Sequence, residues 1–115
     1  MLRDLESLID IERAAHHILG FSQGIQYTEL IANSEKLSAI LYQITIIGEA
    51  TKRISIEFRQ NHPEIPWRNL AGMRDIIIHE YDQVDFDIVW DVIQYKLPQL
   101  LTNLQPLIIN SEPPS

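Results

Sequence analysis

Apolar residues recur at the three- and four-residue spacing of an α-helix along most of this 115-residue chain. Clear stripes of this kind cover residues 3–22, 35–60 and 86–105. Sustained period-two alternation and Asn-Gly or Asp-Gly turns, which signal β-hairpins, are missing from the sequence. The pattern therefore predicts an all-α fold, an antiparallel bundle of four to five helices.

Cap and turn residues divide this pattern into elements. Ser34 is the expected N-cap of the helix over residues 35–60, which a short helix or linker precedes. Pro63 and Pro66 interrupt the chain after that helix, and Pro66 fits the first turn of the next one, over residues 67–81. Asp85 is then the expected N-cap of the last helix.

Two further residues predict local features of these helices. Gly48 lies in the middle of a helix, where glycine costs about 1 kcal/mol relative to alanine, so we expect another backbone to approach closely there. Pro98 should kink or restart the last helix. The chain is long enough for one core, so residues 1–109 are predicted to form a single domain, followed by a frayed tail over residues 110–115.

Composition limits the chemistry and the location of the protein. There is no cysteine, which excludes disulfides, thiolate metal sites and cysteine nucleophiles. No uncharged apolar run approaches the roughly 20 residues that span a bilayer, and acidic residues interrupt any signal-peptide pattern near the start. A cytoplasmic location without a membrane partner is therefore expected.

The formal net charge of −7 argues against a broad nucleic-acid-binding surface. The acidic residues are concentrated toward the two ends of the chain, whereas six of the nine lysines and arginines lie between residues 34 and 81. A small cleft in that middle region is therefore expected to be locally positive, with weak and salt-sensitive affinity for RNA.

The histidines and aspartates do not form a metal-binding pattern. His16 and His17 point about 100° apart on a helix and are expected at the surface, and His62 is expected as a solvated loop residue. The spacing of four aspartates fails the calcium-loop pattern (Asp82, Asp85, Asp87 and Asp91). Helix capping and the electrostatics of a helix N-terminus explain Asp85 and Asp87 without a ligand. Gly-rich phosphate loops are also missing, so no metal and no cofactor are predicted.

One stretch combines residues that suit phosphate chemistry. Arg74, His79 and Tyr81 surround an isoleucine triplet, residues 76–78, that looks buried. On an ideal helix Arg74 and Tyr81 are nearly eclipsed, but His79 lies about 140° from Arg74. All three therefore meet only if the helix end distorts or if the long Arg74 side chain reaches across. By spacing alone they also fit the edges of an ordinary core helix.

The run Arg74-Asp75-x-x-x-His79-x-Tyr81 resembles the R-x-x-x-x-H-x-Y motif of HepT-like toxins in the HEPN superfamily. The resemblance covers nearly the whole chain. Further matching segments follow in family order: Arg3-Asp4, residues 8–11, Ile46-Ile47-Gly48-Glu49-Ala50, residues 65–68, residues 72–74, Val84-Asp85, Val89-Trp90 and Leu97-Pro98.

The resemblance implies a function. The protein would be the toxin of a bacterial or archaeal toxin–antitoxin pair. It would form an all-α homodimer and act as a metal-independent endoribonuclease, with RNA as its substrate. The implied partner is a minimal nucleotidyltransferase antitoxin, which attaches AMP to Tyr81. Arg74 and His79 would be catalytic, with Tyr81 and Asp75 orienting the phosphate. Asp75 departs from the asparagine that is commonest there, and its charge is expected to weaken RNA binding.

The residue types fit this chemistry. RNA supplies its own 2′-hydroxyl nucleophile, and histidine can act as base or acid near neutral pH, while arginine stabilises a phosphorane. One motif supplies one histidine but the reaction needs two proton-transfer groups, so a two-fold dimer is expected to form a composite site. The alternative is a non-catalytic helical partner and AMP acceptor of a nucleotidyltransferase.

Overall fold

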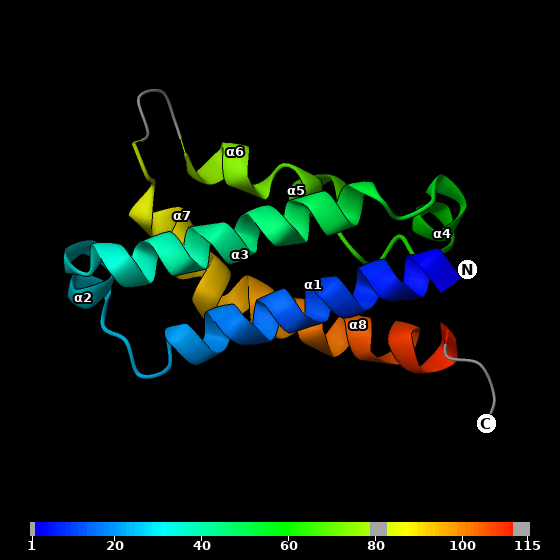
Figure 1. Cartoon of the computed structure of the whole chain (residues 1–115), viewed down its shortest axis with the longest axis horizontal. Coiled ribbons are helices and arrows are strands. Elements are labelled where there is room, and N and C mark those ends of the chain that lie inside the picture. The colour runs from blue at the N-terminus through cyan, green and yellow to red at the C-terminus, as the bar shows by residue number, and fades with distance from the viewer. Residues whose placement is uncertain (1, 79–82, 112–115) are drawn as a thin grey trace.

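The predicted all-α fold is confirmed (Figure 1). The computed structural model describes residues 2–78 and 83–111. Within those residues the only strand-like pairing is one antiparallel bridge between Ile78 and Val84. The helical segments are α1 (Leu2–Phe21), α2 (Tyr27–Ala32), α3 (Ser34–Lys52), α4 (Ile56–Asn61), α5 (Trp67–Ala71), α6 (Met73–Ile77), α7 (Phe86–Asp91), the π-helical segment η2 (Val92–Lys96) and α8 (Leu97–Ser111).

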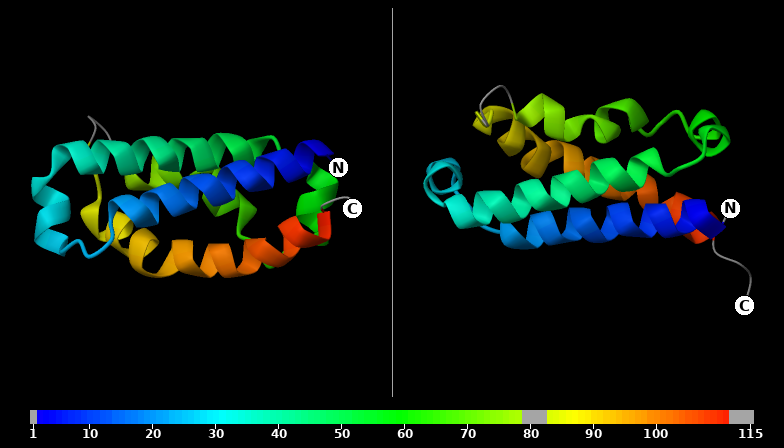
Figure 2. Two further views of the ribbon diagram at one scale, coloured as in Figure 1. Left: turned by 60° about the horizontal axis from the view of Figure 1, so that its bottom comes forward. Right: turned by 45° about the horizontal axis from the view of Figure 1, so that its top comes forward.

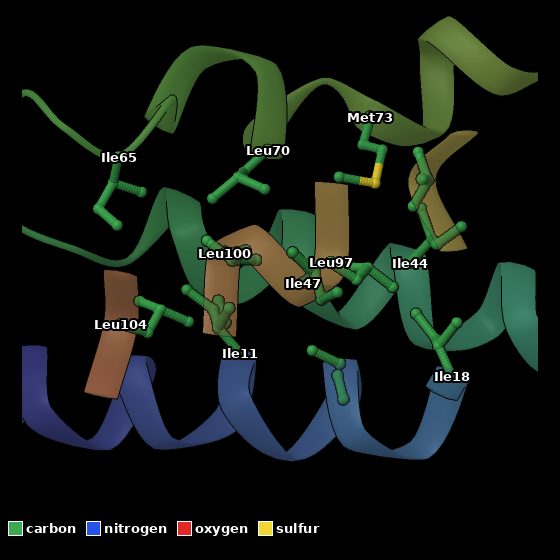
Figure 3. Packing of buried hydrophobic residues seen from close by; sticks show 14 of the residues in the cluster. Ile11, Ile18, Ile44, Ile47, Ile65, Leu70, Met73, Leu97, Leu100 and Leu104 are labelled. Carbon is green, nitrogen blue, oxygen red and sulfur yellow. The ribbon is translucent and has the colours of Figure 1, made fainter. Parts of the chain in front are cut away.

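The longest helices define the bundle. Helices α1 and α3 run antiparallel side by side, α8 packs on α1, and α5 and α6 lie along α3 (Figure 2). Their apolar faces meet in one core, to which all of these helices contribute buried side chains (Figure 3): Ile11, Ile18, Ile44, Ile47, Leu70, Met73, Leu97, Leu100 and Leu104. Across the described residues, no helix has both the length and the apolar character that a membrane span requires.

The helix predicted over residues 35–60 is broken in the structure. It begins at Ser34, and its N-cap is Asn33, whose side chain accepts a hydrogen bond from the Lys36 amide at 2.9 Å. It ends at Lys52, after which the Ser55 side chain caps the separate helix α4. An asparagine or serine side chain that accepts a hydrogen bond from a backbone amide starts a new helix. The apolar stripe therefore forms two helices, one capped by Asn33 and the other by Ser55.

The helix predicted over residues 67–81 is also wrong in length. Gly72 separates α5 from α6, and α6 ends at Ile77 because the backbone of Ile78 is extended, with φ −102° and ψ 113°. Pro66 is the N-cap of α5 rather than a residue of its first turn. Both short helices contact α3.

The last helix confirms two predictions and corrects a third. The Asp85 side chain caps α7 and accepts a hydrogen bond from the Ile88 amide at 3.2 Å. A π-helical turn precedes α8, whose second residue, Pro98, has no amide hydrogen for the carbonyl four residues earlier. The helix continues to Ser111, beyond the predicted end at residue 105 and into the expected tail, whose residues 112–115 lie outside the described residues.

The close approach predicted at Gly48 is confirmed. A Cβ atom added there would lie 3.2 Å from the Ala71 carbonyl oxygen and 3.6 Å from that of Leu70. Both oxygens belong to α5, so this contact sets the distance between α3 and α5. Because α6 begins two residues after Ala71, the same contact places α6 on the bundle.

We expect Gly48→Ala to lower the free energy of unfolding by about 1–3 kcal/mol, because the added methyl group must push α5 away from α3. Gly20, in α1, is the matched control, since a Cβ atom there would meet nothing within 4 Å. Gly20→Ala should therefore stabilise the protein by up to about 1 kcal/mol through helix propensity. Urea denaturation of both variants measures the difference, and equal effects would contradict this role of Gly48.

A buried carboxylate joins the start of α1 to the start of α4. Asp4 is only 6% exposed, and its two carboxylate oxygens accept hydrogen bonds from the amide and the hydroxyl of Ser55, each at 2.8 Å. Burial by itself raises the pKa of Asp4, but these hydrogen bonds outweigh burial and hold the pKa below its usual value. The ionised form is therefore the one that stabilises this junction.

We expect Asp4→Asn to lower the free energy of unfolding by about 1–3 kcal/mol near neutral pH, because an amide cannot accept both hydrogen bonds. Folding lowers the pKa of Asp4, so its contribution is complete above the ordinary carboxyl pKa of about 4 and is lost as the pH falls through the lowered value. Denaturation curves near pH 7 and near pH 3 should show the two proteins converging in acid. A difference that stays constant with pH would refute this prediction.

Candidate functional site

The structure places Arg74 and Asp75 on the outer side of α6. The Arg74 side chain is 53% exposed and that of Asp75 is 86% exposed. Their closest charged atoms are 3.8 Å apart, which is a weak surface ion pair. Among the described residues no other carboxylate pairs with Arg74, so its guanidinium is accessible to a phosphate.

The end of α6 determines how the motif continues. The Ile78 amide donates a hydrogen bond to the Arg74 carbonyl at 2.8 Å, and there the helix stops. Ile78 then pairs with Val84, and the Asp85 amide donates to the Ile77 carbonyl at 2.8 Å. The residues just before the segment 79–82 are therefore bonded to the residues just after it.

His79 and Tyr81 lie outside the described residues. Their predicted roles stay predictions, but the ideal-helix geometry expected for them does not apply, because α6 ends at Ile77. The isoleucine triplet also differs from expectation. Ile77 is fully buried, whereas Ile76 is 45% exposed and Ile78 is half-buried, because a five-residue helix turns only part of its surface to the core.

Helix α7, which follows this segment, is tied to α2. The Tyr27 hydroxyl donates a hydrogen bond to Asp87 Oδ1 at 2.5 Å, and the Tyr27 ring meets the Trp90 ring edge-on at a centroid distance of 5.7 Å. The hydrogen bond to Asp87 raises the pKa of Tyr27 above its usual value, because the carboxylate stabilises the protonated hydroxyl. The local sequence pattern does not predict this pair, since its members are 60 residues apart in the chain.

The cations of the middle region do not gather around Arg74 as expected. Arg53 pairs with Asp10 at 3.3 Å, and the Arg59 guanidinium donates to the Thr51 carbonyl at 2.7 Å at the end of α3. These residues lie toward the end of the bundle that carries α4, away from α6 (Figure 1). Arg53 and Arg59 are therefore engaged elsewhere on the bundle.

The exposure and contacts of the other three histidines are described by the structure. His16 and His17 are exposed, as predicted. His62 is a loop residue, as predicted, but it is only partly solvated: its side chain is 30% exposed and its ring packs on Phe58 at a centroid distance of 4.4 Å. Its carbonyl accepts a hydrogen bond from Trp67 Nε1 at 2.9 Å. No group of three or more possible metal ligands occurs in the part of the chain that the structure describes.

Three of these four aspartates lie among the described residues, and each has a structural role. Asp85 caps α7, and Asp87 accepts the hydrogen bond from Tyr27. Asp91 pairs with Lys96 at 3.6 Å, across the start of the π-helical turn. Asp82 lies outside the described residues.

A mostly apolar groove of about 460 Å³ lies between α5–α6 and η2–α8. Ile76 and the 69% exposed Tyr95 are on its rim, but neither Arg74 nor Asp75 lines it. The groove is therefore a surface separate from the exposed guanidinium. The sequence pattern did not reveal it, because Ile76 belongs to an isoleucine triplet that looks like core.

The all-α bundle thus presents the motif arginine, Arg74, exposed on the short helix α6. The family model described as "Ribonuclease HepT-like" matches residues 11–107, and the chain belongs to this family. This confirms the resemblance seen in the sequence.

Individual relatives match over most of their length. "Putative RNase MJ1216" of Methanocaldococcus jannaschii is 35% identical over 111 residues, which covers 96% of this chain and 92% of that protein. "Probable ribonuclease HepT" of Thermococcus cleftensis is 36% identical over 100 residues, covering 87% of this chain and 91% of that protein. No solved structure matches the chain significantly.

Proposed function

We propose that this protein is an endoribonuclease and the toxin of a toxin–antitoxin pair. The observation that carries the proposal is the accessible guanidinium of Arg74. The backbone carbonyl of Arg74 accepts a hydrogen bond from the amide of Ile78, the residue before His79. Family membership and the names of the relatives support the ribonuclease activity. Arg74 and His79 are assigned to catalysis.

The proposed reaction needs no metal ion, because RNA contains its own nucleophile. A base removes the proton of the 2′-hydroxyl, whose oxygen attacks the adjacent phosphorus, and the bond to the 5′-oxygen breaks as an acid protonates that oxygen. The products are a 2′,3′-cyclic phosphate and a 5′-hydroxyl. His79 transfers a proton, and Arg74 stabilises the charge on the phosphorane oxygens.

A homodimer completes the site in this proposal. One chain supplies one motif histidine, whereas the reaction needs a base and an acid, so a two-fold copy supplies the second His79 and the second Arg74. Ile76, exposed two residues from Arg74, offers apolar surface for such a contact.

Tyr81 is proposed as the control point. A minimal nucleotidyltransferase, acting as antitoxin, would attach AMP from ATP to the Tyr81 hydroxyl and release pyrophosphate. The added phosphate would place negative charge near Arg74 and compete with RNA for the guanidinium. Asp75, on the exposed face beside Arg74, adds to this repulsion and limits RNA affinity.

We expect His79→Ala to lower kcat/KM for cleavage of a labelled mixed-sequence RNA by about a hundredfold or more, since general acid–base catalysis contributes that much. Arg74→Ala should have a similar effect, because it removes stabilisation of the phosphorane. Arg68→Ala, an exposed arginine on α5 outside the motif, is the matched control and should stay within about twofold. The wild-type rate should be unchanged by EDTA.

Expression in bacteria tests the toxin role in the same set of variants. Wild type and Arg68→Ala should arrest growth, and His79→Ala and Arg74→Ala should not. Equal growth arrest by all four proteins, or growth arrest by none of them, refutes the toxin proposal. RNA cleavage that survives loss of His79 refutes the catalytic role of His79. A dimer that binds its nucleotidyltransferase tightly but cleaves no RNA would favour the non-catalytic alternative.

We expect the intact mass to rise by whole AMP units when the protein is incubated with the nucleotidyltransferase and ATP. Tyr81→Phe should abolish the increase, because it removes the accepting hydroxyl. Tyr42→Phe is the matched control, since Tyr42 is 65% exposed on α3 and should leave the modification intact. Modification of the Tyr81→Phe protein would assign the acceptor to another residue.

A further inference from the structure

The groove between α5–α6 and η2–α8 exposes an apolar surface next to an exposed aromatic ring. Tyr95, on the rim, is 69% exposed. The floor of the groove is formed by side chains of the hydrophobic core, each at most 6% exposed (Figure 3): Leu70, Met73, Leu97 and Leu100. Covering the floor and the ring together would remove apolar surface from water, which favours association at this face.

The groove is poor in charge, although the chain carries a net charge of −7. Among the described residues that line it there is no aspartate or glutamate, and the lysine that lines it, Lys96, pairs with Asp91 at 3.6 Å. Two copies of an acidic chain repel one another, so they associate most readily where neither copy presents an unpaired carboxylate. The charge of the groove therefore suits a second copy of this chain.

The groove and Tyr95 also make this face complementary to itself. A two-fold contact brings the same patch of both copies together, so the patch must supply both a hollow and a side chain that fills it. The groove is a hollow of about 460 Å³, and the exposed ring of Tyr95 lies on its rim. Tyrosine suits this role because its ring buries a large apolar area while its hydroxyl bonds to a polar group, such as the amide of Asn69 in the groove.

We propose that this groove is the interface between two copies of the chain, in which Tyr95 of each copy occupies the groove of the other. The inference rests on the homodimer proposed above and assigns the face that forms it. Ile76, on the rim, belongs to α6, the helix that carries Arg74. The contact therefore includes the motif helix of both copies.

Two variants test the two halves of this contact. Tyr95→Ala removes the ring, and Asn69→Trp fills the groove with an indole. Both positions are exposed, so the melting temperature of each variant should stay close to that of wild type. Tyr42→Ala is the matched control, because Tyr42 is 65% exposed on α3, outside the groove.

Sedimentation over a range of protein concentrations gives the Kd of the dimer. Tyr95→Ala should raise this Kd about a hundredfold or more, because truncation of a buried interface tyrosine is costly and a two-fold dimer contains the change twice. Asn69→Trp should also weaken the dimer, whereas Tyr42→Ala should stay within about threefold of wild type. Wild type that stays monomeric, or a dimer that persists unchanged in Tyr95→Ala, overturns the proposal.

A mixture of the two variants tests whether the copies insert into one another. The Asn69→Trp copy keeps its Tyr95, and the Tyr95→Ala copy keeps an open groove, so one of the two contacts can form between them. With Tyr95→Ala fluorescently labelled at its N-terminus, the Kd of the mixed dimer should be about tenfold or more below that of either variant with itself. A mixed dimer no tighter than these would overturn the reciprocal insertion.

Cleavage of the labelled RNA separates this inference from the proposed function. Tyr95→Ala should cleave more slowly per chain than wild type at a concentration where only wild type is dimeric, and raising its concentration should restore the rate. Loss of the dimer in Tyr95→Ala while wild type cleaves no RNA supports the interface and refutes the ribonuclease proposal. Cleavage at the wild-type rate by monomeric Tyr95→Ala also supports the interface but refutes the composite site.

Discussion

The close contact between Gly48 and the backbone of α5 is the constraint on which the candidate site depends. A side chain at this position would hold α5 away from α3, and α6 would move with it, because one residue separates the two short helices. Arg74 is on α6, so its place on the bundle is set by a residue that carries no functional group. A glycine in mid-helix is tolerated here because it permits two backbones to pack.

Irregular backbone is concentrated near the same site. Gly72 separates α5 from α6, α6 ends after five residues, and the π-helical turn η2 follows α7 (Figure 1). The long regular helices α1 and α3 form a rigid frame, while short elements joined by specific hydrogen bonds place the motif. Tyr27 and Asp87 connect two of these short elements, α2 and α7.

The ion pairs and hydrogen bonds of the structure show which cations of the middle region are already engaged. The sequence concentrates cations in its middle region, but Arg53 and Arg59 are engaged at the end of the bundle that carries α4. One accessible motif arginine can bind a single phosphate. A chain with a net charge of −7, in contrast, is poorly suited to binding RNA along its length. Pairing of two motifs in a dimer is one way to add positive charge where the reaction needs it.

The sequence by itself determined the all-α class, the close contact at Gly48, the cap at Asp85 and the motif that identifies the family, because periodicity, capping and motif spacing are local properties. The tertiary structure alone decided where helices stop, as at Lys52 and Ile77. It also decided that Ile76 is exposed and that Tyr27 meets Asp87. These features depend on partners distant in the sequence, and a local pattern holds no information about which distant residue will satisfy a side chain or bury it.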